Sequence, residues 1–337
     1  MDSLTQILLG ASVSETVMQN KVGRKASLWG AIIGTLPDLD VFIPMGNAVN
    51  DFTYHRAESH AFFYMALATP ILAWIITKVH PKTKIYRWRW LLAVFLTFIT
   101  HAILDSFTVY GTQLFLPFTN YPVGWNTIFV IDPMYTLPLL IAIIGFLIIR
   151  NKSFALKTNK MALALSSLYL IWGIVAQQYV HSKAERSFRS QNIEVSQTLV
   201  GPTPFNTLLW RVVGMTEEGY VEGFYSLMDD SNQITFKAYS SEKILIEPIK
   251  EDRNVNRLSW FSKNFYKVSQ LDDKIIMSDL RMGYGEVYFF SFVVGEKSQS
   301  QISSTKVKQL EIEGFDDFEP IKKLWQRIWN EQLILNE

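Results

Sequence analysis

Long apolar stretches separated by short polar connections occupy the first 180 residues of the chain and then cease. Four stretches approach or reach the length of about 20 apolar residues with which a helix crosses a bilayer. They are residues 61–79, 90–107, 134–149 and 161–180. Two shorter stretches, 3–18 and 28–43, lie at the lower edge of spanning length and are also compatible with buried or half-inserted helices. The pattern predicts a polytopic membrane domain of about four to six helices.

Beyond residue 181 the pattern changes to that of a soluble domain. "HSKAERSFRSQ" continues the last apolar helix as a polar one, and "GYVEGFYSLM", "QITFKAYS" and "EVYFFSFVV" have the period of two that is typical of strands. The glycines of "RMGYGEV" predict a turn or bulge. "DFEPIKKLWQRIWNEQL" has apolar residues at helical spacing and predicts a closing amphipathic helix. We predict a helical membrane domain over 1–180 and an α+β domain over 181–337.

Basic residues indicate how the membrane domain is oriented. They concentrate in the connections 21–25, 78–89 and 150–160, whereas the connection 105–132 contains no Lys or Arg. Because short cytoplasmic loops collect Lys and Arg, the three basic loops are expected in the cytoplasm and 105–132 outside. Six helices with both ends outside fit every loop and make the C-terminal domain extracytoplasmic. The N-terminus has no basic region followed by a cleavage site, so we expect no removable signal peptide.

Composition then restricts the chemistry. The chain has 337 residues and a formal net charge of +1, which gives no electrostatic signature of nucleic-acid binding. It contains no Cys. Disulfides, thiolate nucleophiles and Cys-based zinc sites are therefore excluded, and any metal site depends on His, Asp and Glu.

Ionisable residues gather at or just beyond the outer ends of the predicted helices. They are Asp2, Asp38, Asp40, His55, His60, His101, Asp105 and Asp132. Dispersed structural charges have no reason to choose one side of a membrane. In "THAILDSF", His101 and Asp105 stand four residues apart on one helix face, where burying ionisable groups in an apolar helix is costly and favours a functional role.

Each motif also has a structural interpretation. The two aspartates of "TLPDLDVF" follow a proline and are compatible with a solvated helix terminus. The histidines and arginine of "YHRAESH" are compatible with interfacial polar residues ahead of a span. Asp132, before Pro133, is typical of an N-terminal helix cap. We infer a site from the convergence of these motifs on one side of the membrane domain. Histidines and aspartates without thiolates suit zinc, manganese or iron, and such a metal activates water for attack on an ester or phosphoester.

Several of these stretches together resemble one family. "MDSLTQILLGA", "GAIIGTLPDLDVF", "YHRAESHAFF", "HAILDSFTVYGTQLFLPF" and "FVIDPMYTLPLL" resemble, in order, the YdjM-like membrane-bound metal-dependent hydrolases, and "TPFNTLLWRVV" resembles the start of the family's extramembrane part. The resemblance implies a bacterial inner-membrane protein with a distant similarity to zinc-dependent phospholipases C, whose helical metal sites also use a His and an Asp four apart. It implies as strongest ligands Asp38, His60, His101 and Asp105, followed by Asp40, His55 and Asp132.

The chain departs from this pattern in two places. Many members resemble "DSLTHALLG" where this chain has "DSLTQILLG", so Gln6 replaces a histidine. Glutamine is a poor zinc ligand, and one metal of a multinuclear site is then missing or held differently. In "HRAESH", Ala57 and Glu58 stand where the family more often has Gly followed by Thr or Ser two places later. Glu58 is compatible with an added ligand, a general base or a solvated charge.

These observations predict an integral membrane protein of the bacterial inner membrane that hydrolyses an ester or phosphoester with metal-activated water at the outer membrane surface. The location favours a membrane lipid or lipid-linked substrate. Asp38 or Glu58 is the expected general base, and Arg56 or the metal, with zinc ahead of manganese and iron, stabilises the developing charge. Arg56 is equally compatible with pairing to Asp51 or Glu58. The alternative is a non-catalytic scaffold or envelope factor with a structural His/Asp cluster and a partner-binding soluble domain. A transporter is disfavoured because no repeat appears.

Overall fold

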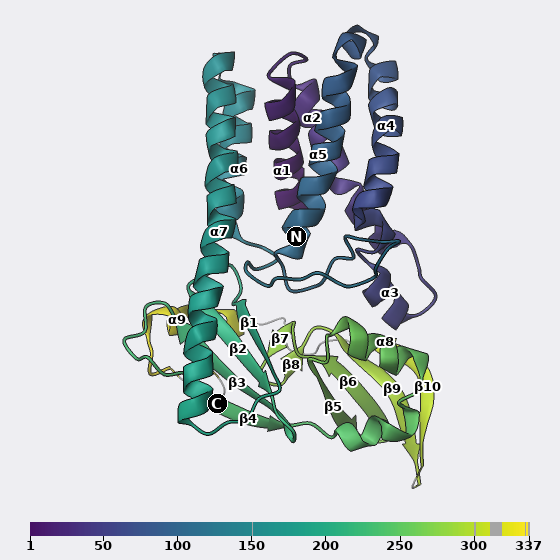
Figure 1. The fold of residues 1–337 in the computed structure, drawn as a ribbon, viewed down its shortest axis with the longest axis vertical. Helices are drawn as coiled ribbons and strands as arrows, with labels where there is room; N and C mark the ends of the chain where they lie inside the picture. Colours follow the sequence, from purple (N-terminus) through teal and green to yellow (C-terminus); the bar gives the residue numbers. More distant parts are fainter. Residues whose placement is uncertain (150, 300, 311–318, 334, 336–337) are drawn as a thin grey trace. The chain divides into compact units, whose positions relative to one another are not determined.

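The computed structural model describes residues 1–149, 151–299, 301–310, 319–333 and 335 (Figure 1). The chain forms two compact units. The first comprises Met1–Ile43 and His55–Ile174, and the second comprises Pro44–Tyr54 and Val175–Glu337. Helices make up the first unit, and antiparallel sheets with helices make up most of the second. The predicted fold class, a helical membrane domain followed by an α+β domain, is confirmed.

The first unit contains the apolar helices. Its elements are α1 (Ser3–Met18), α2 (Lys25–Thr35), η1 (Pro37–Phe42), η2 (Glu58–His60), α4 (Phe62–Val79), η3 (Pro81–Tyr86), α5 (Arg87–Ser106), α6 (Pro133–Ile148) and the start of α7 (Lys152–Ser190). Within the described residues, three helical stretches are long and apolar enough to cross a membrane: α4, Pro81–Ser106 and α7. The apolar α6 is shorter, at 16 residues. The predicted polar continuation of the last span is confirmed, because α7 runs without a break to Ser190.

The apolar segment 28–43 is not one helix. The α-helix ends at Thr35, and the short 3-10 helix η1 begins at Pro37. Proline has no N–H to donate to the preceding turn, so the α-helical hydrogen-bond pattern stops there. The consequence is functional, because η1 carries Asp38 and Asp40 at the end of α2 instead of within a continuous span.

Glycines let α1 and α2 pack with their backbones in contact. A Cβ atom built on Gly30 would lie 2.2 Å from the carbonyl oxygen of Gly10, and one on Gly34 would lie 2.5 Å from the carbonyl oxygen of Gln6. Only glycine permits so close an approach, as in other small-residue helix contacts of membrane proteins. Both helices also pack against α5 (Figure 1). This packing brings Gln6 and Gly34 to His101 on α5.

Gly30→Ala is therefore expected to destabilise the first unit by about 1–3 kcal/mol, because the added methyl group must push the two backbones apart. Gly145→Ala in α6 is the matched control, since its Cβ meets only an ordinary contact at 3.5 Å. The control should be neutral or gain helix stability. Thermal unfolding of both variants in one detergent measures the difference. Equal melting temperatures for Gly30→Ala and the wild type would contradict the backbone contact.

The second unit contains two four-stranded antiparallel sheets. The first has the order β1-β2-β3-β4, with bounds Gln197–Pro202, Leu209–Met215, Gly219–Ser226 and Phe236–Ser240. The second has the order β10-β9-β6-β5, with bounds Gln301–Gln309, Ser291–Ser298, Lys274–Asp279 and Tyr266–Leu271. A hairpin of β7 (Gly283–Tyr284) and β8 (Val287–Tyr288) confirms the turn predicted in "RMGYGEV". The helical elements are α3 (Ala48–Tyr54), η4 (Lys243–Ile249), α8 (Arg253–Phe261), α9 (Glu319–Trp329) and the remainder of α7.

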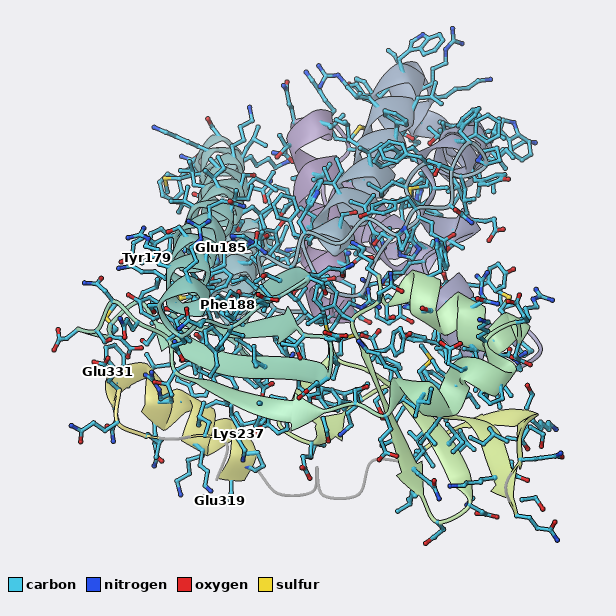
Figure 2. All side chains as sticks on the ribbon, turned by 60° about the horizontal axis from the view of Figure 1, so that its bottom comes forward. Tyr179, Glu185, Phe188, Lys237, Glu319 and Glu331 are labelled. Carbon is cyan, nitrogen blue, oxygen red and sulfur yellow. The ribbon has the colours of Figure 1, made fainter. Side chains whose placement is uncertain are left out.

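Both faces of the first sheet are covered, which explains why every residue of β2 and β3 is buried. On one face, α7 packs against the alternate residues Trp210 and Val212. Its residue Phe188, labelled in Figure 2, stacks on Phe236 with ring centroids 4.4 Å apart. On the other face, α9 packs against Leu209 and Phe224. The predicted closing amphipathic helix is confirmed over Glu319–Trp329, and its first two residues, 317–318, lie outside the described residues.

Candidate metal centre

Four side chains from three elements of the first unit converge on one point. Asp38 comes from η1, His60 from η2, and His101 and Asp105 from the end of α5. One ligand atom from each lies within 4.8 Å of all the others. Both histidines and Asp105 are buried, whereas the Asp38 side chain is 19% exposed. The group can hold a metal ion and is approached from the side of Asp38.

The spacing of the ligand atoms fits a single small cation. The Nε2 atoms of His60 and His101 are 3.1 Å apart, and Asp105 Oδ2 lies 3.0 Å from the first and 3.4 Å from the second. Asp38 Oδ1 lies 3.4 and 3.6 Å from the same two nitrogens. Ligands about 2.0–2.1 Å from a tetrahedral zinc ion are separated from one another by about 3.3 Å. The observed distances fall on both sides of that value.

Hydrogen bonds on the far side of each ring fix which nitrogen faces the cluster. His101 Nδ1 lies 2.8 Å from the carbonyl oxygen of Gly34, which only accepts, so this nitrogen carries the proton. Ser59 Oγ donates to Asp40 Oδ2 and therefore accepts from His60 Nδ1, at 2.8 Å. In the neutral imidazole form both Nε2 atoms then present lone pairs toward two carboxylates, and this is the form in which histidine binds a metal. Carbonyl and carboxylate partners of this kind also orient the histidine ligands of metals.

Asp105 divides its two oxygens between support and the cluster. Oδ1 accepts from Gln6 Nε2 at 3.1 Å, contacts the Met1 amine and lies 3.5 Å from Arg56 Nη2. Oδ2 is buried and faces the Nε2 atoms of His60 and His101, and when both rings are neutral with the proton on Nδ1 it receives no hydrogen bond from the described residues. A buried carboxylate oxygen left unsatisfied is destabilising, and a bound metal ion would satisfy it. The donor set and this orphaned oxygen therefore fit a divalent metal.

Gln6 takes a supporting position in this structure. It is fully buried, and its Nε2 also lies 3.3 Å from the carbonyl oxygen of His101. The side chain thus contacts a ligand residue through its amide group, where the family resemblance places a histidine. The cluster that can hold a metal consists of four residues without it.

Asp40 and His55 form a second layer behind His60. Their side chains meet at 2.6 Å, and Asp40 Oδ2 accepts from the backbone N–H of Arg56 at 3.0 Å. The same oxygen lies 3.7 Å from His60 Nδ1, the ring nitrogen that faces away from the cluster. In this geometry Asp40 orients His60 through Ser59, and His55 in turn holds Asp40.

Arg56 and Glu58 occupy different surroundings. Arg56 is buried, has a left-handed backbone with φ of 64°, and donates to Thr108 Oγ1 at 3.3 Å. Its guanidinium lies 5.0 Å above the ring of Tyr110 and pairs with Asp105. Glu58 is exposed in η2 beside a groove. Arg56 therefore supplies a fixed positive charge beside the cluster, and Glu58 lines the groove.

Asp132 adopts the cap geometry considered from the sequence. Its carboxylate accepts from the N–H of Met134 at 3.1 Å, at the start of α6, and from the hydroxyl of Tyr169 at 3.0 Å. It is not a member of the four-residue group. Burial raises the pKa of the Asp132 carboxyl to about 6.

Asp132→Asn is expected to leave the metal content unchanged, because an amide oxygen still accepts from the helix N-terminus. The pKa in the folded state lies above the ordinary value of about 4, so the wild type loses stability as the pH rises from about 4 through 6. The variant should lose less over that interval. Melting temperatures from pH 4 to 7 and elemental analysis test both points. Loss of metal in Asp132→Asn would instead make this residue a ligand.

The fold and the cluster define a class: a membrane protein with apolar helices and a buried His/Asp group that can hold a metal ion. Residues 1–180 match the family model described as YdjM inner membrane protein, and the chain belongs to that family. The predicted resemblance to the YdjM-like family is confirmed, and the distant similarity to zinc-dependent phospholipases C stays a prediction. The chain is also 22% identical over 307 residues to "Uncharacterized protein YfhP" of Bacillus subtilis (strain 168), covering 87% of this chain and 90% of that protein. No solved structure matches the chain.

Proposed function

We propose that this protein is a membrane-bound, metal-dependent hydrolase that acts on an ester or phosphoester of a membrane lipid or lipid-linked compound. The observation that carries the proposal is the convergence of two buried imidazole Nε2 atoms with two carboxylates, one of which, Asp38, is partly exposed. The histidines and aspartates of the cluster are the residue types found in hydrolytic metal sites. Membership of a membrane-protein family supports a substrate drawn from the bilayer.

Asp38, His60, His101 and Asp105 would hold the metal, zinc first and manganese or iron as alternatives. A divalent ion there supplies Lewis acidity and lowers the pKa of the attacking water. In the overall reaction, water adds to phosphorus or to a carbonyl carbon, the bond to the alcohol oxygen breaks, and that oxygen receives a proton.

The remaining residues have distinct roles in this proposal. Asp38, as the exposed member of the cluster, is placed to accept the proton of the water, and Glu58 is the other candidate base. Arg56 provides a fixed positive charge that opposes the negative charge developing on the substrate. Asp40 and His55 orient His60 without touching the substrate.

The proposed location is the outer surface of the bacterial inner membrane, with several spans and an extracytoplasmic C-terminal unit. Loop charges support this orientation. Single cysteines introduced into residues 78–89 of this Cys-free chain should remain unlabelled by an impermeant maleimide in intact cells, whereas cysteines in 115–125 should be labelled. The opposite labelling pattern would invert the topology and remove the argument for an outer-surface site.

One observation favours a second function. Four protein ligands complete a tetrahedron, which is typical of structural zinc sites, whereas catalytic sites usually keep one position for water. The second candidate is thus a non-catalytic scaffold or envelope factor in which the cluster fastens η1, η2 and α5 together and the soluble unit binds a partner.

A hydrolysis assay separates the two functions. The metal-loaded protein is incubated in mixed micelles with phospholipids and lipid-linked phosphates, and a water-soluble phosphodiester serves as the comparison substrate. The hydrolase predicts release of product that a chelator abolishes and that added zinc or manganese restores. A stoichiometrically loaded protein that releases no product from any of these substrates would favour the scaffold.

A further inference from the structure

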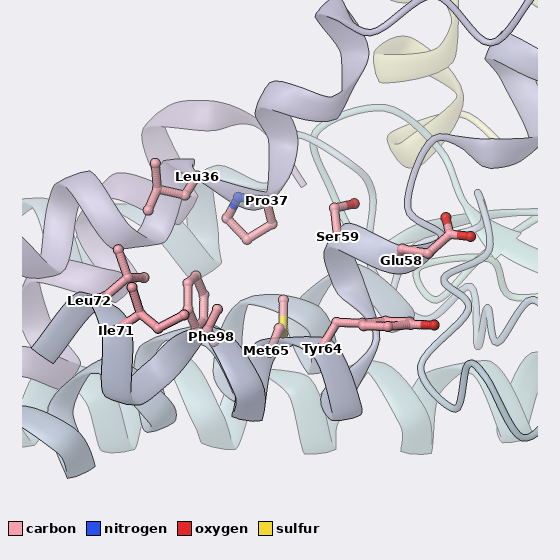
Figure 3. Close-up of a pocket in the computed structure, with 10 residues that line it drawn as sticks. Leu36, Pro37, Glu58, Ser59, Tyr64, Met65, Ile71, Leu72 and Phe98 are labelled. Atoms are coloured by element: carbon pink, nitrogen blue, oxygen red, sulfur yellow. The ribbon is translucent and has the colours of Figure 1, made fainter.

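A groove of about 340 Å³ lies beside the cluster, between η1, η2, α4 and α5 (Figure 3). Its walls include the immediate neighbours of three cluster residues. Pro37 precedes Asp38, Ser59 precedes His60, and Phe98 lies one helical turn before His101. The groove and the cluster are therefore built from the same backbone segments.

The two ends of the groove differ in chemistry. Glu58 and Ser59 line one end, and Figure 3 shows Ile71 and Leu72 at the other, with Met65 and Phe98 between them. The middle and far parts are wholly apolar. The polar end adjoins one cluster residue, because Ser59 precedes His60 in η2 and its hydroxyl hydrogen-bonds to the outer ring nitrogen of His60, Nδ1.

The long wall of the groove is one face of a candidate membrane span. Met65, Ala68 and Leu72 follow one another along α4 at intervals of three and four residues, which places them on the same face. Ile71, which also lines the groove, is 60% exposed, and the adjacent Leu67 and Trp74 are 56% and 60% exposed. In a membrane protein such a helix surface faces hydrocarbon, so the apolar end of the groove is accessible to lipid chains.

We propose that this groove binds one hydrocarbon chain of a membrane lipid and thereby presents the lipid's headgroup to the cluster. The proposal rests on the proposed function for the lipid's role as substrate, but the binding itself does not require catalysis. A volume of about 340 Å³ is at the small end of ligand pockets and suits a single chain. The carboxylate of Glu58 at the polar end disfavours a net anionic headgroup and favours a zwitterionic one that carries an ammonium group.

Native mass spectrometry of the detergent-purified full chain tests the groove directly, with dioleoyl-phosphatidylethanolamine as the probe. Ala68→Trp fills the groove from α4, and Ala66→Trp is the matched control because Ala66 is exposed on the same helix outside the groove. The wild type and Ala66→Trp should each retain one lipid, and Ala68→Trp should bind it at least about tenfold more weakly. Leu72→Trp, one turn further on, replaces Ala68→Trp if that variant is not extracted as a folded protein.

The outcomes separate this proposal from the proposed function. Equal lipid retention by the groove-filling variant and the wild type overturns the groove, as does an equal loss in Ala66→Trp. Groove-dependent lipid binding by a wild type that holds no metal supports the lipid site while removing the metal-dependent hydrolase. Full metal content and hydrolysis without groove-dependent lipid binding would support the metal-dependent hydrolase and overturn the lipid site.

Discussion

Replacing His101 with alanine is expected to reduce the bound metal from about one ion per chain to less than about a tenth, because a four-ligand site loses one of its two buried imidazole nitrogens. Hydrolysis should fall to the uncatalysed level. The effect is large because the hydrogen bond from Nδ1 to the Gly34 carbonyl fixes the ring and holds Nε2 in place as a ligand. Elemental analysis of detergent-purified protein measures the metal content.

His80→Ala is the matched control, because His80 follows the last residue of α4 and packs edge-on against Trp29 with ring centroids 6.2 Å apart, outside the cluster. It should retain its metal. A His101→Ala protein that is extractable and folded but inactive supports catalysis. Loss of the folded protein itself, in both His101→Ala and His101→Gln, supports the scaffold. Full metal content in His101→Ala would exclude this cluster as the metal site.

Arg56→Lys is expected to lower kcat by about 10²–10³-fold while leaving most of the metal in place. The guanidinium is a rigid fork held by Thr108 and Tyr110, and a lysine ammonium cannot reproduce its several directed donors. The Nη2 atom of Arg56 lies 3.5 Å from Asp105 Oδ1, the oxygen that does not face the cluster. The positive charge is therefore beside the ligands, and Arg56 is not itself a ligand. Rates and metal content are measured on the same preparation.

Arg24→Lys provides the comparison, since Arg24 donates to the carbonyl oxygen of Leu147 at an exposed position outside the cluster. Its kcat should not change. If Arg56→Lys lost metal in proportion to activity, Arg56 would be a structural partner of Asp105. If it kept full activity, the role of stabilising charge on the substrate would be removed.

Much of the helical architecture follows from the local sequence. Apolar runs of bilayer length predicted α4, α5 and α7, and Pro37 marked the end of α2. Alternation with a period of two predicted strands within β3, β4 and β9. These features depend on residues that are near one another in the chain, which is why a pattern reveals them.

The assignment of Pro44–Tyr54 to the second unit was not predicted. This short segment contains α3, whose Phe52 stacks on Phe290 with centroids 4.3 Å apart and meets Phe261 at 4.9 Å. Its partners lie more than 200 residues away in the chain. A single phenylalanine between two apolar segments gives no signal of such a distant contact. The division of the chain into domains at residue 180 stays a prediction from the sequence pattern.

For the candidate site, too, the sequence indicated the residues but not the distant contacts that hold them. Histidines and aspartates on one side of an apolar domain are rare enough to be noticed, and the structure brings four of them together. The groups that hold them are common: the backbone carbonyl of Gly34, the hydroxyl of Ser59 and the amide of Gln6. Of these, only the glycine spacing of "GAIIGT" could have indicated a close helix contact, and it does not specify which atom would face His101.

X-ray absorption spectroscopy at the metal edge of the wild-type protein is the most direct test of the central claim, because it reports the ligands of the bound ion without reference to activity. We expect one ion per chain, coordinated by two imidazole nitrogens and by carboxylate oxygens at about 2.0–2.2 Å. Spectra with a single imidazole or none, or a wild type that takes up no zinc, manganese or iron after reloading, would contradict it.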